Sequence, residues 1–275
     1  MPRRRALHTG KRWASQTLIF LCFFIFWPLG AIHSTLASEW KEEKGDHFIV
    51  YYVQDEVSAK KVVRKAEYCY NKIASDLGYS RYSNFWQWDN RVKIYLHTSV
   101  EDFQKATGQP VWSHGMASYL DKTIHSFEAN EQFLNAILPH EIAHLIFRDF
   151  VGLEGQVPLW MDEGVAQWEE ADKRDSAKKF VRELVSRENV FSIRFLTSMD
   201  IRKETNEKKV HLFYIQAVSL VDFLITKYGA ARFTAFCREL RDGKPLDAAL
   251  NSAYAGSIQG VEELDAKWKK HALEA

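Results

Sequence analysis

Two histidines and a glutamate in one short run are the residues of this chain with the clearest capacity for chemistry. His140, Glu141 and His144 form an HExxH pattern, in which the histidines are four residues apart. Residues at that spacing lie on one face of a helix, about 5–6 Å apart at Cβ, so both imidazoles can reach one zinc ion at about 2.0–2.1 Å. We expect Glu141, one position round the helix, to reach the water that zinc activates and to act as the catalytic base.

The alternative for this pattern is a surface helix with two solvated histidines. The flanking residues argue against it, because the segment 137–147 is otherwise rich in apolar residues. A helix this apolar is expected to be buried, and buried polar groups need partners, which a metal ion can provide. Pro139 is expected to kink the helix or to start a new one just before His140.

A second short segment offers the remaining metal ligand. Eighteen residues separate His144 from Glu163, and Pro158 opens a helix pattern between them. That separation allows a turn and a return that brings the second helix beside the first. Two histidines and one glutamate are an established catalytic zinc set that leaves a fourth position open to water. We therefore expect Glu163 to be the third ligand of one zinc ion per chain, with the adjacent Asp162 as the alternative.

The periodicity of the chain predicts the elements that must position these residues. Strands are expected at 47–53, 91–96 and 123–127, and helices at 57–77, 101–106, 131–150 and from 158 onward. Further helices are expected at 173–186, 208–228, 230–241, 245–254 and 260–273. This order predicts an α+β lobe with the zinc-binding helices over 38–172, followed by a helical lobe of the same catalytic domain over 173–275.

The first 37 residues have the layout of a secretory signal peptide. Five basic residues stand among the first twelve, followed by an apolar run over 18–32 and by the small residues Thr35 and Ala37 of a cleavage site. We therefore expect export to the periplasm or the extracellular space, with cleavage after Ala37. The alternative is an uncleaved anchor that attaches the protein to a membrane, although the run is short for the roughly 20 residues that a span needs.

Composition and charge exclude some classes of function. The chain is 46% hydrophobic and 14% aromatic, which indicates a sizeable core and argues against disorder. Its net charge is +1, and the loss of five positive charges with the leader leaves −4. A chain with this small negative charge gives no electrostatic reason to expect nucleic-acid binding.

Two cysteines, Cys69 and Cys237, remain after the leader. They form either one disulfide or two buried thiols.

Several of these stretches resemble the gluzincin metallopeptidases, and within them the peptidase-MA-like group. The specific motifs are 138–144 and 160–166, while the run 214–229 and the strand 47–52 are similar to looser features of the group. The resemblance covers residues 40–270. It implies a thermolysin-like zincin core with a mixed sheet, one zinc ion, and hydrolysis of peptide bonds in a peptide or protein substrate.

The resemblance also implies roles for residues outside the two motifs. Tyr214 is the first choice for a donor that stabilises the oxyanion of the reaction, and its alternative is a core role. His211 is the other candidate donor and could equally be a surface residue. Independently of the resemblance, the position of Gln167 one turn past Glu163 makes it either a support for that ligand or an ordinary exposed polar residue of the helix.

The strand over 123–127, after the segment 115–118, is a further candidate by analogy. In gluzincins the corresponding edge strand holds the peptide backbone by strand addition. Here the strand is either that edge or part of the core. His125 on this strand is expected to be a structural histidine rather than a residue of the cleft.

Two other functions are compatible with these motifs. A non-peptidase zinc hydrolase would share the ion and the base and would differ in having a small closed pocket instead of a groove. A binding module that kept the fold without catalysis would usually lack the base or a ligand, and here Glu141 and all three expected ligands are present. The sequence therefore favours a peptidase.

Overall fold

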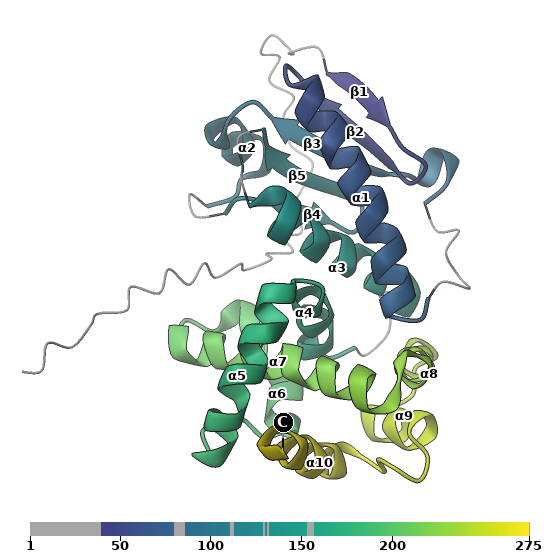
Figure 1. Ribbon diagram of the computed structural model, residues 1–275, viewed down its shortest axis with the longest axis vertical. Coiled ribbons are helices and arrows are strands. Elements are labelled where there is room, and N and C mark those ends of the chain that lie inside the picture. Colours follow the sequence, from purple (N-terminus) through teal and green to yellow (C-terminus); the bar gives the residue numbers. More distant parts are fainter. Residues whose placement is uncertain are drawn as a thin grey trace, which may run out of the picture.

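The computed structural model describes residues 40–79, 86–110, 113–128, 130, 132–152 and 157–274. The predicted signal peptide or anchor lies outside these residues and stays a prediction. Figure 1 shows an upper part built on a β-sheet and a lower part made of helices, in which the C-terminus lies.

A five-stranded mixed sheet forms the framework of the upper part. Its strands are β1 (Lys41–Lys44), β2 (Phe48–Tyr52), β3 (Val92–His97), β4 (Met116–Ser118) and β5 (Thr123–Phe127), in the spatial order β1-β2-β3-β5-β4. The three inner strands are parallel to one another, and β1 and β4 run antiparallel at the two edges. The register places Val50 opposite Ile94 and Ile94 opposite Ile124. All three side chains are fully buried, so the alternating sequence pattern gives the sheet one apolar face.

Three helices accompany the sheet. They are α1 (Glu56–Asp76), α2 (Val100–Thr107) and α3 (Leu138–Val151), the last preceded by a π-helical turn at Phe133–Ile137. The carboxylate of Asp55 accepts from the backbone N–H of Ser58 and caps α1, and Ser99 caps α2 in the same way. α1 lies across one face of the sheet and packs against α3 (Figure 1).

The lower part consists of seven further helices. They are α4 (Leu159–Trp168), α5 (Ala171–Ser186), α6 (Ile193–Ser198), α7 (Glu207–Tyr228), α8 (Ala230–Arg241), α9 (Leu246–Ala253) and α10 (Val261–Glu274); short 3-10 turns occur at Trp88–Asn90 and Ile201–Lys203. α7 contacts α4, α5, α8 and α10. It is long and apolar enough to cross a membrane, but 67% of its most apolar window is buried inside the fold, as expected of a core helix.

The expected α+β class with a helical C-terminal part is confirmed. The strand at 123–127 is not an edge strand, however, because β5 lies between β3 and β4 and leaves β4 at the edge. The sequence pattern also does not predict β1, β4 or α6. The division of the catalytic domain at residue 172 stays a prediction.

The two cysteines of the described chain are free thiols, not one disulfide. Cys69 lies on α1 and Cys237 on α8, and both side chains are buried. Burial raises the pKa of Cys69 to about 11 and that of Cys237 to about 12. Both groups therefore remain protonated and unreactive at neutral pH.

Candidate metal centre

The HExxH residues stand on α3, and the local sequence explains where this helix begins. Pro139 lies in the first turn of α3, where a missing backbone N–H leaves no hydrogen bond unmade. The π-helical turn ends at Ile137 and α3 begins at Leu138, so of the two outcomes expected of Pro139, a kink or a new helix, the structure shows the start of a new α-helix. The side chains of His140, Glu141 and His144 are all buried.

Glu163 stands on α4, whose position is set by close packing against α7. A Cβ atom added at the adjacent Gly164 would lie 2.5 Å from the backbone oxygen of Ala217 on α7. Only a glycine permits so close an approach of the two helices. Because α4 also packs against α3, Glu163 is held between the HExxH helix and the central helix of the lower part.

Three side-chain atoms from α3 and α4 converge on one point. Nε2 of His140 and Nε2 of His144 are 3.1 Å apart, and Nε2 of His144 is 3.8 Å from Oε2 of Glu163. One ligand atom of each residue lies within 4.8 Å of the others. Oε2 of Glu163 is buried without a hydrogen-bond partner among the described residues, although a buried polar atom normally has one.

This arrangement fits a divalent metal ion. Two donor atoms that bind a tetrahedral ion at about 2.0–2.1 Å are roughly 3.3–3.4 Å apart, close to the separations found here. A cation at this point would also give the orphaned oxygen of Glu163 a partner. Two imidazoles and one carboxylate are a donor set that catalytic zinc takes. The structure thus brings together the three residues that the sequence indicates as ligands.

The other ring nitrogen of each histidine faces a buried carboxylate. Nδ1 of His144 is 3.1 Å from Oδ1 of Asp162, and Arg148 donates to Oδ2 of the same carboxylate. Nδ1 of His140 is 2.8 Å from Oε1 of Glu170. Such partners fix the tautomer that presents Nε2 to a metal. Asp162, the alternative third ligand, therefore lies on the outer side of His144 and not in the converging group.

The buried charges shift the protonation equilibria of this cluster. Burial alone would lower the pKa of His144, but the neighbouring carboxylates, Asp162 foremost, raise it to about 9. Burial alone would raise the pKa of Asp162, but His144 and Arg148 hold it well below its usual range. Burial also raises the pKa of Glu163. The cluster carries an excess of negative charge, so it favours a cation, whether a proton on His144 or a metal ion.

Tyr214 and Gln167 lie on the two helices that meet at Gly164. Tyr214 is buried on α7, three residues before the close approach at Ala217, and its ring centroid is 5.6 Å from that of Phe213. This places Tyr214 on the helix beside α4 and leaves its role as an oxyanion donor a prediction. Gln167 is also buried, and no hydrogen bond between its side chain and Glu163 occurs in the described part of the chain.

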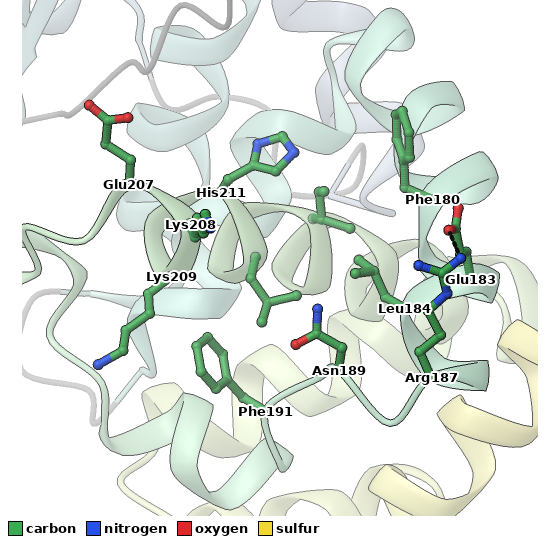
Figure 2. Close-up of a pocket in the computed structure, with 12 residues that line it drawn as sticks. Phe180, Glu183, Leu184, Arg187, Asn189, Phe191, Glu207, Lys208, Lys209 and His211 are labelled. Carbon is green, nitrogen blue, oxygen red and sulfur yellow. Dashed lines mark ion pairs between the residues drawn. The ribbon is translucent and has the colours of Figure 1, made fainter. Parts of the chain in front are cut away.

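His211 lies on another surface of the molecule. It is exposed and lines an open cavity of about 800 Å³ formed by α5, the turn after it, and α7. Figure 2 shows His211 at the upper rim of this cavity and Phe180 at its right-hand side. Burial and then Lys173 lower the pKa of His211. None of the three candidate ligands lines the cavity, so it is separate from the metal centre.

His125 is part of an aromatic cluster on the sheet. Its Nδ1 is 3.1 Å from Nε2 of His97, and its ring stacks on Tyr95 with the centroids 4.8 Å apart. Burial lowers the pKa of His125 to about 4, and the neighbouring His97 contributes. These contacts agree with the expected structural role.

Sequence reasoning missed Arg148 and Glu170. Arg148 follows His144 by four residues on α3, so the spacing rule that pairs the two histidines also places Arg148 on that face. Glu170 is thirty residues from His140. It lies beyond the last residue of α4, at the N-cap of α5, so no spacing along one helix indicates it.

An HExxH helix packed against a second helix with a candidate acidic ligand, beside a mixed sheet, defines a zincin-like fold. A family model described as Peptidase MA superfamily matches residues 83–273, which include all the candidate ligands and Glu141. This match covers more than half of the chain, and the chain belongs to the peptidase MA superfamily. The expected gluzincin-like group is thereby confirmed, and the function is of the metallopeptidase type at superfamily level. A comparison with curated proteins found no match.

Proposed function

We propose that this protein is an exported zinc-dependent peptidase that hydrolyses peptide bonds in a peptide or protein substrate. The observation that carries the proposal is the convergence of two imidazole nitrogens and the unpartnered oxygen of Glu163 at one buried point. Membership of the peptidase MA superfamily supports peptides as the substrate class. The leader over residues 1–37 supports export to the periplasm or the extracellular space, with residues 18–32 as a membrane anchor if the leader is retained.

Each residue of the centre has a role in this proposal. His140, His144 and Glu163 hold one zinc ion, which supplies Lewis-acid chemistry that polarises a peptide carbonyl and makes a water molecule acidic near neutral pH. Glu141 takes a proton from the attacking water and returns it to the leaving amine. Its burial on α3, beside the ligands but outside the converging group, supports this role. Tyr214 donates a hydrogen bond to the developing oxyanion.

The free edge of β4 supports a polypeptide as the substrate. β4 contacts α3, and its outer side pairs with no strand among the described residues. An extended peptide can add to such an edge through main-chain hydrogen bonds. An open edge suits an extended chain better than a small molecule that needs a closed pocket, which favours a peptidase over a non-peptidase zinc hydrolase.

The substitution Glu141→Gln tests the proposed chemistry. The amide keeps the shape of the side chain but cannot accept a proton, and the three ligands are untouched. We expect about one zinc per chain in the variant and a loss of hydrolysis of roughly 10²–10⁴-fold, the usual worth of a positioned acid or base. Cleavage of a peptide library is followed by mass spectrometry, and zinc content by elemental analysis.

The matched control is His144→Ala, which should lose both zinc and cleavage. Unchanged cleavage in zinc-loaded Glu141→Gln would remove Glu141 as the base. If the wild-type protein holds zinc and binds peptides without cleaving any of them, it is a binding module and not a peptidase.

A further inference from the structure

Glu170 occupies an unusual place for a buried acidic residue. It lies two residues after the last residue of α4, Trp168, and is the N-cap of α5, yet its side chain makes no capping hydrogen bond. Residues at this position usually accept from the first backbone N–H groups of the helix. Oε1 of Glu170 instead lies 2.8 Å from Nδ1 of His140, with side-chain exposures of only 5% and 4%.

The backbone of Glu170 is fixed from both sides. Its N–H donates to the carbonyl oxygen of Gln167 in α4, and its own carbonyl oxygen accepts from Lys173 and Arg174 in α5. The carboxylate is therefore presented to His140 from a rigid junction between two helices. A group held in this way can fix the orientation of the ring that it contacts.

The contact also determines which nitrogen of His140 carries the proton. A carboxylate only accepts hydrogen bonds, so the neutral imidazole must keep its proton on Nδ1. Nε2 then presents a lone pair, and this is the nitrogen that faces Nε2 of His144. In the described part of the chain, the imidazole of His140 is the one side-chain partner of the Glu170 carboxylate, whereas the Asp162 carboxylate also contacts the guanidinium of Arg148.

We propose that Glu170 is the positioning residue of His140, which holds this histidine in the tautomer and orientation that bind the ion and strengthens it as a ligand. The inference rests on the proposed function, because it concerns the metal that the centre would hold. It follows that Glu170 serves metal binding at some cost to folding, since a buried carboxylate without a cationic partner is unfavourable.

Glu169 provides a matched control. It is the neighbouring residue and its side chain is equally buried, but its Oε2 accepts from Nζ of Lys72 on α1 at 2.8 Å. Glu169 thus joins α4 to α1 by an ion pair, and Glu170 contacts a ligand of the metal centre. Substitutions of Glu170 should therefore weaken zinc binding without loss of stability, whereas substitutions of Glu169 should lower stability without loss of zinc binding.

The experiment compares Glu170→Ala, Glu170→Gln, Glu169→Ala and Glu169→Gln in the full chain. Zinc affinity is measured by competition with a chromophoric chelator, and the stability of the metal-free protein by urea unfolding in the presence of a chelator. The visible spectrum of the cobalt-substituted protein reports the ligand geometry. None of these measurements depends on turnover.

We expect Glu170→Ala to weaken zinc binding by about 10–100-fold, the usual effect of removing such an outer partner. Glu170→Gln should lose less, because its amide oxygen still accepts from Nδ1, and should leave the metal-free protein at least as stable as the wild type. The Glu169 variants should be less stable and should bind zinc with wild-type affinity and cobalt spectrum. Equal zinc affinities in the Glu170 and Glu169 variants would overturn the inference, whereas a wild-type protein that binds no zinc would overturn the proposed function itself.

Discussion

Asp162 and Glu163 are adjacent carboxylates that the structure places in different positions. Successive residues on a helix point about 100° apart, so Glu163 faces the converging imidazole nitrogens while Asp162 reaches the far side of His144. The pair of acidic residues that looks ambiguous in the sequence therefore consists of one candidate ligand and one outer partner. The difference is set by the direction in which each side chain leaves α4.

The proposed contribution of Tyr214 to catalysis is one hydrogen bond from its hydroxyl group to the oxyanion. Tyr214→Phe should lower turnover by on the order of 10²-fold, the effect of losing one donor to an oxyanion, with zinc content and unfolding midpoint unchanged. Steady-state kinetics on a cleaved peptide measure this. Tyr228→Phe removes a hydroxyl near the far end of the same helix and should leave turnover at the wild-type level. Equal rates in wild type and Tyr214→Phe would return Tyr214 to a purely structural role.

The sequence indicates much of the candidate centre, because spacing on one helix is a local property. His140, Glu141 and His144 could be placed on α3 from their separation alone. Glu170 could not, because its contact with His140 depends on how the α4–α5 junction folds back onto α3, across thirty residues. The same limit applies to Tyr214, whose position relative to α4 is set by the packing of two helices far apart in the chain.

Helix α4 is the element on which the centre depends most. It carries Glu163, and Gly164 allows it to approach α7 at backbone contact distance. The helices and strands of the fold were predictable from the sequence to different degrees. α1, α3 and α7 show long apolar periodicity. In contrast, β1 (Lys41–Lys44) consists only of charged residues, and β4 has only three residues. These two strands form by pairing with β2 and β5, and pairing leaves no periodic signal in so short a segment.

Gly164→Ala should disturb this packing. The added methyl group would meet the backbone oxygen of Ala217 at 2.5 Å and a side-chain carbon of Val221 at 2.8 Å. Overpacking of this kind costs about 1–3 kcal/mol, which exceeds the gain of up to roughly 1 kcal/mol that alanine brings to a helix. Urea unfolding should show a net loss of stability, and chelator competition a weaker hold on zinc because Glu163 is displaced. An alanine variant as stable as the wild type would show that α4 and α7 can separate without cost.

At the scale of the whole molecule, the candidate centre joins the sheet-bearing part to the helical part. Two ligands come from α3, which packs against α1, and one comes from α4, which packs against α7. A metal ion at this point would cross-link helices that belong to different layers of the fold. Binding to the folded state alone stabilises a protein by about 2.7 kcal/mol when the free ligand is at a hundred times its Kd.

Removal of the metal should therefore lower the thermal stability of the protein. We expect a chelator to reduce Tm by roughly 5–10 °C, given about 2–4 °C per kcal/mol for a chain of this size, and added zinc to restore it. Differential scanning calorimetry measures the shift. His144→Ala should melt at one temperature with and without chelator. A wild-type Tm that is insensitive to both additions would argue against a metal that spans the two helices.

The two edges of the sheet differ in how they meet other polypeptides. An exposed strand edge is a template for pairing with further chains and hence for aggregation. β1 consists only of lysine and glutamate residues, three of its four residues being exposed, and such charges discourage a neighbouring molecule from adding a strand. β4 is uncharged but only three residues long, too short to seed a growing sheet. Among the described residues, the sheet therefore leaves one short uncharged edge, β4, for pairing with another polypeptide, and its length limits that pairing to a few main-chain hydrogen bonds.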